Sequence, residues 1–362
     1  MTIRVNLWLK KENMLWVGIA ISFVKIALVL FVVLTLVAYL TLAERRISAF
    51  IQDRLGPNRV GPFGLLQPLA DGVKFIFKED IIPEKANKAF YVMAPALSLV
   101  TAIVALAVIP IGKGFNTTLF GLLEDPFYVK LQIADVNAGL LFVLAITSLS
   151  VYGVVLGGWS SNSKYSLLGG LRAAAQMISY ELSLGLSILG VILLAGSLRL
   201  NDIVEAQQKV WFAIPQALGF LVFMVSSFAE TNRLPFDLPE AEPEIVAGYH
   251  TEYSSMKFAM FFMAEYTHMI VASALMVCFF LGGWYPLPFG GWFGIDIDRY
   301  WYLPPMVFIG KVFFLLFVFI WVRWTIPRFR YDQVMKLGWK VLFPLAVLNI
   351  IATSAVMVFV VN

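Results

Sequence analysis

The chain has little charge and almost no cysteine or histidine. Only 14% of its 362 residues are charged, whereas a soluble domain usually has about 25%. Cys278 is the one cysteine, so the chain cannot form an internal disulfide or supply the ligands of an iron–sulfur cluster. The two histidines, His250 in a loop and His268 in an apolar run, are a poor basis for a haem site.

Nucleotide-binding motifs are also missing. The sequence has no Walker-type phosphate loop and no dinucleotide fingerprint. Glu265-x-x-His268 is half of a di-iron bundle motif, but no second copy occurs. We therefore expect no cofactor or metal to be bound by this chain alone. Any energy-coupled function then needs a partner or a co-transported solute.

Apolar residues are abundant, at 60% of the chain with 31 Phe, and they predict an all-α polytopic membrane protein. A span needs about 20 mainly apolar residues, and eight stretches qualify. They are roughly 19–43, 88–112, 130–157, 171–196, 210–231, 255–284, 304–325 and 339–361. The first stretch is longer than a signal peptide's core, so we expect a retained helix. Residues 1–362 are expected to form a single transmembrane domain.

The distribution of Lys and Arg predicts the orientation of these spans. Most of them lie in the loops after the first, third, fifth and seventh spans. Loops rich in Lys and Arg stay on the inner side of a membrane. We therefore expect a multi-pass protein of a bacterial cell inner membrane with both termini facing outward, into the periplasm.

The first inner loop, 43–85, predicts a surface helix. Proline and glycine at 56–62 interrupt the helix of the first span. Beyond them, Gln67, Asp71, Lys74 and Lys78 recur at the spacing of one helix face, and Leu65, Leu69, Val73 and Ile76 fall on another. This amphipathic helix could be an interfacial anchor, or it could border a cavity or dock a partner.

Charged residues lie at the inner end of the first span. They are Glu44, Arg45, Arg46, Asp53 and Arg54. They can be interpreted as basic anchors on the inner side. Alternatively, their guanidinium groups could pair with carboxylates of another subunit.

Several carboxylates fall within or at the ends of apolar spans: Asp135, Glu181, Glu230 and Glu265. A carboxylate at mid-membrane costs about 2.5–3.5 kcal/mol on insertion scales, so such residues usually face a protein-lined or aqueous interior. Each could be a structural hydrogen-bonding group. Together, at staggered depths, they predict a chain of protonatable sites leading from the inner surface into the membrane.

Another inner loop, Asn232 to Tyr253, is dense in acid. Its carboxylates are Asp237, Glu240, Glu242, Glu244 and Glu252, and three prolines recur every four residues. Proline at this spacing prevents a regular helix, so the backbone must be buried against protein or water. The loop could respond to charge by protonation and repacking, or it could be a surface that docks basic partner loops.

Three segments resemble signature sequences of one family of membrane subunits, the H subunits of respiratory complex I, the NADH–quinone oxidoreductase. They read AERRISAFIQDRLGPNRVGPFGLLQPLADGVKFIFKED, SKYSLLGGLRAAAQMISYE and AETNRLPFDLPEAEPEIVAGYHTEYSSMKFA. The resemblance extends from about Leu42 to the eighth span and implies a translocase subunit with quinone as substrate. It also implies partners: hydrophilic quinone-site subunits, one of which holds an iron–sulfur cluster, and antiporter-like membrane subunits.

The resemblance assigns roles to particular residues. It implies that Arg45, Arg46, Asp53, Arg54 and Arg59 line or brace the quinone chamber near its mouth. It implies that Glu230, Asp237, Glu240, Glu242, Glu244 and Glu252 form an acidic funnel beneath the chamber. Finally, it implies that Asp71, Asp135, Glu181 and Glu265 continue the acid path toward the antiporter-like subunits.

The leading hypothesis is thus a quinone-binding, proton-coupling subunit of a large redox complex. A related coupling subunit of a membrane-bound hydrogenase is the first alternative. A stand-alone proton-coupled transporter is the second, and it predicts an inverted repeat with broken helices that the sequence does not contain.

Overall fold

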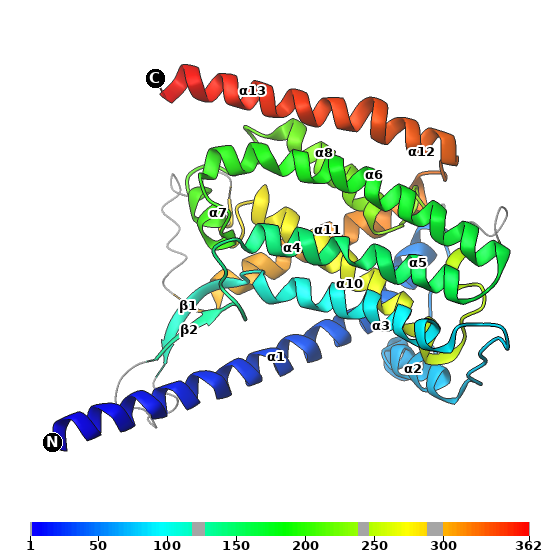
Figure 1. Ribbon diagram of the computed structural model, residues 1–362, viewed down its shortest axis with the longest axis horizontal. Coiled ribbons are helices and arrows are strands. Elements are labelled where there is room, and N and C mark those ends of the chain that lie inside the picture. Colours follow the sequence, from blue (N-terminus) through cyan, green and yellow to red (C-terminus); the bar gives the residue numbers. More distant parts are fainter. Residues whose placement is uncertain (1, 118–126, 238–245, 288–299, 362) are drawn as a thin grey trace.

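The computed structural model describes residues 2–117, 127–237, 246–287 and 300–361, and Figure 1 draws their arrangement. The first half contains α1 (Thr2–Ile51), η1 (Pro62–Gly64), α2 (Gln67–Phe77), α3 (Lys88–Ala105), η2 (Leu106–Val108), β1 (Gly112–Thr117), β2 (Phe127–Leu131), α4 (Gly139–Ser148) and α5 (Ser150–Ser160). The second half contains α6 (Lys164–Ala195), α7 (Leu200–Ala206), α8 (Ala217–Glu230), η3 (Gly248–His250), α10 (Ser255–Phe279), α11 (Leu303–Thr325), α12 (Tyr331–Leu337), the π-helical turn η6 (Gly338–Leu342) and α13 (Phe343–Val361). The predicted helical, multi-pass architecture is confirmed.

Among the described residues, seven helices are long and apolar enough to cross a membrane. The fifth predicted span, by contrast, corresponds to α8, which has 14 residues and extends only about 21 Å at 1.5 Å per residue. The sequence predicted a longer span there, 210–231, but residues before 217 form turns that include Pro215. Proline lacks the N–H that would continue a helix.

Two other predicted boundaries were wrong. The first helix does not stop at residue 43 but continues to Ile51, so Glu44 and Arg45 lie on it. The third span does not begin at residue 130, because 127–131 form β2, which pairs with β1 in an antiparallel hairpin. Phe127, Tyr128 and Val129 favour a strand, and a helix starts only at Gly139. Asp135 therefore precedes the span that was predicted to contain it.

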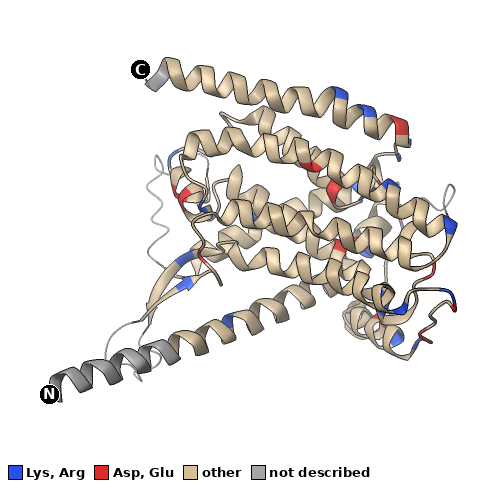
Figure 2. Cartoon of the chain, viewed as in Figure 1, with Lys and Arg blue, Asp and Glu red and all other residues tan. Residues whose placement is uncertain are grey.

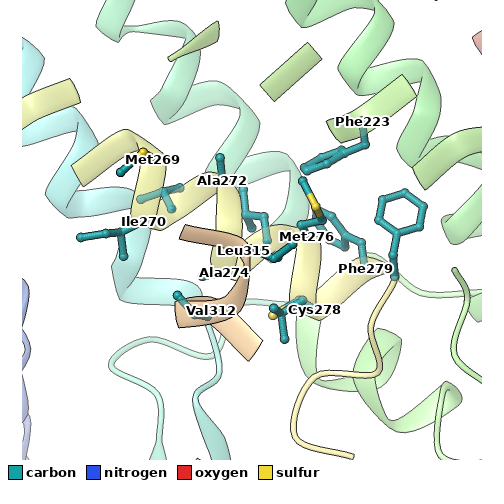
Figure 3. Close-up of a cluster of buried hydrophobic side chains, with 14 of the residues drawn as sticks. Phe223, Met269, Ile270, Ala272, Ala274, Met276, Cys278, Phe279, Val312 and Leu315 are labelled. Atoms are coloured by element: carbon teal, nitrogen blue, oxygen red, sulfur yellow. The ribbon is translucent and has the colours of Figure 1, made fainter. Parts of the chain in front are cut away.

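The centre of the bundle is α10. In its most apolar 18-residue window, 83% of the residues are buried, against 6% for α1. The half from Met269 to Phe279 is buried on every side, as expected of a helix that is apolar all round. It packs against α11 and against Phe223 of α8 (Figure 3).

The buried half of α10 ends in a polar cap. Gly282 and Gly283 adopt positive φ angles that end the helical run. The ammonium group of Lys311 on α11 donates hydrogen bonds to the carbonyls of Leu281 and Gly283, at 2.5 and 3.0 Å. This charge inside an apolar span therefore satisfies buried backbone carbonyls of the turn that follows α10.

Candidate functional site

A buried cluster of charged and aromatic side chains lies where α1, α10 and α11 meet. The carboxylate of Glu44 on α1 accepts a 2.7 Å hydrogen bond from the Tyr266 hydroxyl on α10. It also forms ion pairs with Arg323 on α11 and with Arg233, the latter at 3.5 Å. We call Glu44, Arg233, Glu265, Tyr266 and Arg323 the Glu44 network.

Arg233 links the two carboxylates of this network. Its guanidinium lies 3.9 Å from Glu265, and it covers the ring of Tyr266 at 4.1 Å from the ring centre. The planar guanidinium suits such a site because it can pair with carboxylates and stack on an aromatic face. Removing one partner would leave buried charges without full compensation. A change in the charge or pairing of one member of the Glu44 network therefore changes the pairing of the others.

The turn that carries Arg233 is held in place by α6. The amide of Gln176 donates 2.8 Å hydrogen bonds to the carbonyls of Ala229 and Phe236. Asn232 adopts a left-handed conformation at φ 50°, which Asn tolerates better than most residues. The buried Gln176 side chain thus fixes the path of the chain as it leaves α8 and enters the acidic loop.

Glu265 also borders a second group of acids. It receives a 3.3 Å hydrogen bond from the Tyr249 hydroxyl. Together with Glu230, at the end of α8, it lines an internal cavity of about 20 Å³. The charges of Glu230 and Glu181 interact, and Glu181 accepts a hydrogen bond from Ser148.

The structure therefore brings three predicted acids, Glu181, Glu230 and Glu265, into one series of neighbouring polar groups. Their series continues through Arg233 to Glu44 and ends where the first inner loop begins. Figure 2 shows that acidic positions lie inside the otherwise apolar bundle as well as at its ends. A series of close carboxylates in a protein interior is suited to proton exchange, because burial and neighbouring charges set which site holds the proton.

Asp237 is the first carboxylate of the acidic loop along the chain. It pairs with Arg328 at 2.9 Å. Burial raises the pKa of Asp237 to about 6, although the positive charge of Arg328 opposes this rise. Glu240, Glu242 and Glu244 lie outside the described residues. Glu252 is partly exposed, and its backbone carbonyl accepts a hydrogen bond from the Tyr91 hydroxyl.

The predicted quinone-chamber residues lie at the end of α1 and in the loop after it. Arg45 pairs with Asp71 on α2 at 2.7 Å, and half of its side-chain surface is exposed. Arg46 is partly buried beneath Gly56, where an added Cβ would lie 3.1 Å from its Cα. Three further residues, Asp53, Arg54 and Arg59, are exposed. These residues border an open surface of the chain.

The helix α2 continues this open surface. It has no buried residue, and its apolar positions Leu69, Val73, Ile76 and Phe77 are all exposed. Its polar Gln67 donates a hydrogen bond to Asp71. The predicted amphipathic helix is thus present, and its apolar face is uncovered within the single chain.

Asp135 lies apart from the acids of that series, beside Lys130 of β2 and Arg199 next to α7. Figure 1 shows the hairpin and α7 at one end of the bundle. Asp135 pairs with Arg199 and, at 2.7 Å, with Lys130. The hydrogen bond from the Arg199 guanidinium holds the pKa of Asp135 well below its usual range. These groups line a polar cavity of about 180 Å³ together with Asn201. The geometry favours an ion-pair role, and the place of Asp135 in the acid path stays a prediction.

Sequence reasoning missed several members of the site. Glu44 was noted only as a charge near the end of the first span, and Arg233, Tyr266 and Arg323 were not singled out. His268 was noted beside Glu265, but its position at the cavity was not foreseen. The sequence offered one signal for these residues: Arg and Glu, which have opposite charges, both occur within or at the ends of apolar runs. Within the described residues, no group of three or more His, Cys, Asp or Glu side chains is arranged to hold a metal ion.

Comparisons with known proteins agree with this architecture. A family model described as NADH dehydrogenase matches residues 24–354. Three of the similar proteins are H subunits of bacterial NADH-quinone oxidoreductases. The one numbered 1 in Geobacter metallireducens is 56% identical over 337 residues, 93% of this chain and 96% of that protein. The one numbered 2 in Geobacter sulfurreducens is 56% identical over 344 residues, 94% and 98% of the two chains. The one in Rhodospirillum centenum is 50% identical over 327 residues, 90% of each chain.

Proposed function

Because this chain belongs to the NADH dehydrogenase family and is related along most of its length to the H subunits of NADH-quinone oxidoreductases, we propose that it couples quinone reduction to proton translocation in such a complex. The series of polar groups from Glu44 to Glu181 carries this proposal. It joins the end of α1 to the interior of α6 through side chains whose protonation and pairing depend on one another.

The quinone would bind beside the open surface formed by the end of α1, the loop after it and α2. Arg45, Arg46, Asp53, Arg54 and Arg59 supply polar contacts there, and α2 supplies an uncovered apolar face. Ligand chambers are mostly apolar with a few polar groups that fix orientation. Neighbouring hydrophilic subunits would complete the chamber and supply electrons from an iron–sulfur cluster.

Coupling follows from the position of Glu44 directly before Arg45 and Arg46. Quinone reduction takes up protons and places negative charge in the chamber. Negative charge there competes with Glu44 for the guanidinium of Arg323 and, through it, changes the pairing of Arg233. A carboxylate that loses its guanidinium partner in the interior binds a proton more readily. Glu265 and Glu230 would then pass the change inward, and the acidic loop from Asp237 to Glu252 would respond by protonation.

The other surfaces fit a subunit of a larger assembly. Few residues in the spanning part of α1 are buried in the single chain, and α2 has no buried residue. We propose that these faces contact lipid, hydrophilic quinone-site subunits and antiporter-like membrane subunits, with both termini of the chain facing outward.

The decisive experiment neutralises two acids of the series in the assembled complex. In Glu181→Gln and, separately, Glu230→Gln, we expect normal assembly while coupled quinone reduction and proton translocation fall together by at least about tenfold, equivalent to about 1.36 kcal/mol. Glu205→Gln, an exposed acid on α7, is the matched control and should behave as wild type. Wild-type pumping in both interior variants would contradict the proposal.

Two further outcomes test the alternatives. Proton transport by the purified chain in liposomes would favour a stand-alone transporter. A purified complex without inhibitor-sensitive quinone reduction would favour a hydrogenase-type coupling subunit.

A further inference from the structure

The cavity between Glu230 and Glu265 lies where α3, α5, α6, α8 and α10 meet. Its volume, about 20 Å³, is sufficient for one water molecule and far too small for a quinone. We call it the Glu230 cavity. Its lining residues are Ser98, Ser150, Val154, Met177, Glu230, Thr231, Asn232, Ala264, Glu265 and His268.

Two of the lining side chains have buried polar atoms without a protein partner. Among the described residues, neither the Nε2 atom of His268 nor the hydroxyl of Ser150 has a hydrogen-bond partner. Buried polar groups are nearly always paired with protein or with ordered water. Since both residues border the same cavity, a single water molecule there could serve both.

The same cavity is lined by Glu230 and Glu265, the two acidic residues between which the proposed function requires proton transfer. Glu230 approaches from the end of α8, and Glu265 approaches from α10, one helical turn before His268. Residues three apart on a helix lie on the same side. The residues that line the cavity carry carboxyl, hydroxyl and imidazole groups, and a buried water molecule needs two to four polar partners of this kind.

We propose that His268 and Ser150 hold a water molecule that bridges Glu265 and Glu230, and that protons pass between the two acids through it. The proposal rests on the proposed proton-coupling function and names the connection within it. A protonated Glu265 gives its proton to the water oxygen, while the water gives one of its own protons to the Glu230 carboxylate. Water is regenerated, and one proton has moved from Glu265 to Glu230.

Other charged groups face the two ends of this bridge. Arg233 and the Tyr249 hydroxyl contact Glu265, and Glu181 interacts with Glu230. His268 and Ser150 are thus positioning residues, because they orient the water and leave the proton on the carboxyl groups.

The test compares variants of the assembled complex in sealed vesicles. His268→Phe combined with Ser150→Ala removes both groups that hold the water. We expect proton translocation per assembled complex to fall at least about tenfold and its solvent isotope effect to change, while upstream electron input from NADH to an artificial acceptor is retained. His268→Gln, which keeps a polar group at this site, should restore much of the translocation.

Ser273→Ala is the matched control. Ser273 lies on α10, and its buried hydroxyl also has no hydrogen-bond partner among the described residues, but it does not line the cavity. This variant should translocate protons at the wild-type rate. If the double variant pumps normally while Glu230→Gln does not, the water bridge is wrong and the proposed function survives. If Glu230→Gln and Glu181→Gln also pump normally, the proposed function itself fails.

A direct measurement covers the case in which the double variant does not assemble. An experimental density map of the wild-type complex that resolves ordered water should contain a peak within hydrogen-bond distance of His268 Nε2 and the Ser150 hydroxyl. Well-defined side chains without that peak would overturn the proposal.

Discussion

The hydroxyl of Tyr266 donates a 2.7 Å hydrogen bond to the carboxylate of Glu44, which joins the C-terminal part of α1 to the middle of α10. The peripheral helix that borders the proposed quinone surface is thereby tied to the most buried helix of the bundle. Arg323 and Arg233 pair with the same carboxylate. A change in charge at the end of α1 therefore alters the hydrogen bonding and ion pairing of residues in the core.

Glu44→Ala should prevent normal assembly of the complex. It removes the carboxylate that Arg323 and Arg233 share and leaves Arg233 with the longer contact to Glu265. Breaking a buried pair typically costs about 3–5 kcal/mol. The measurement is the amount of assembled complex in membranes. Asp332→Asn, which breaks an exposed pair with Arg330 at 3.1 Å, is the control and should assemble as wild type. Normal assembly of Glu44→Ala would mean that the network contributes little to the fold.

Arg46→Ala and Asp53→Ala should slow quinone reduction more than upstream electron input. Both residues lie beside the turn at Gly56, where the proposed quinone surface is. A lost polar contact to quinone would lower quinone turnover by about tenfold or more, with little change in the rate of NADH oxidation by an artificial acceptor. Equal losses in both assays would indicate an assembly defect.

Asp237→Asn should change how the stability of the complex depends on pH. Burial raises the pKa of Asp237 from 3.8 to about 6. The folded state therefore holds this proton more tightly than the unfolded state, and the stability gained is present below about pH 4 and lost as pH rises through about 6. The neutral asparagine does not titrate.

Thermal inactivation midpoints at about pH 5 and about pH 7.5, on either side of the raised pKa, provide the measurement. The midpoint of Asp237→Asn, relative to wild type, should be higher at the upper pH than at the lower. Arg328→Gln should have the opposite effect, because it removes the positive charge that favours the ionised form of Asp237. A difference between Asp237→Asn and wild type that is the same at both pH values would contradict the assignment.

Asp135→Asn should loosen the hairpin without changing the number of protons moved per quinone. Its pairs with Arg199 and Lys130 are partly exposed, so we expect a loss of about 0.5–1 kcal/mol. Because its pKa is lowered, the stability it contributes is present above about pH 4 and is lost as pH falls through the lower folded value. A reduced proton-to-quinone ratio at equal assembly would instead place Asp135 in the proton path.

The sequence by itself determined most of the spans and the surface helix, and it singled out carboxylates that lie within apolar runs. These are local properties: a helix's apolar length and the spacing of its faces are written in consecutive residues. Glu181 and Glu265 could be singled out because a carboxylate within an apolar run is costly unless the fold provides for it.

Only the tertiary structure decided which charges pair and where the cavity lies. Glu44 and Tyr266 are 222 positions apart, and Glu44 and Arg323 are 279 apart. Such contacts depend on how helices from distant parts of the chain pack, and no local pattern encodes them. The same holds for His268 and Ser150, on different helices, whose approach to one cavity follows from the packing of α5 against α3 and of α3 against α10.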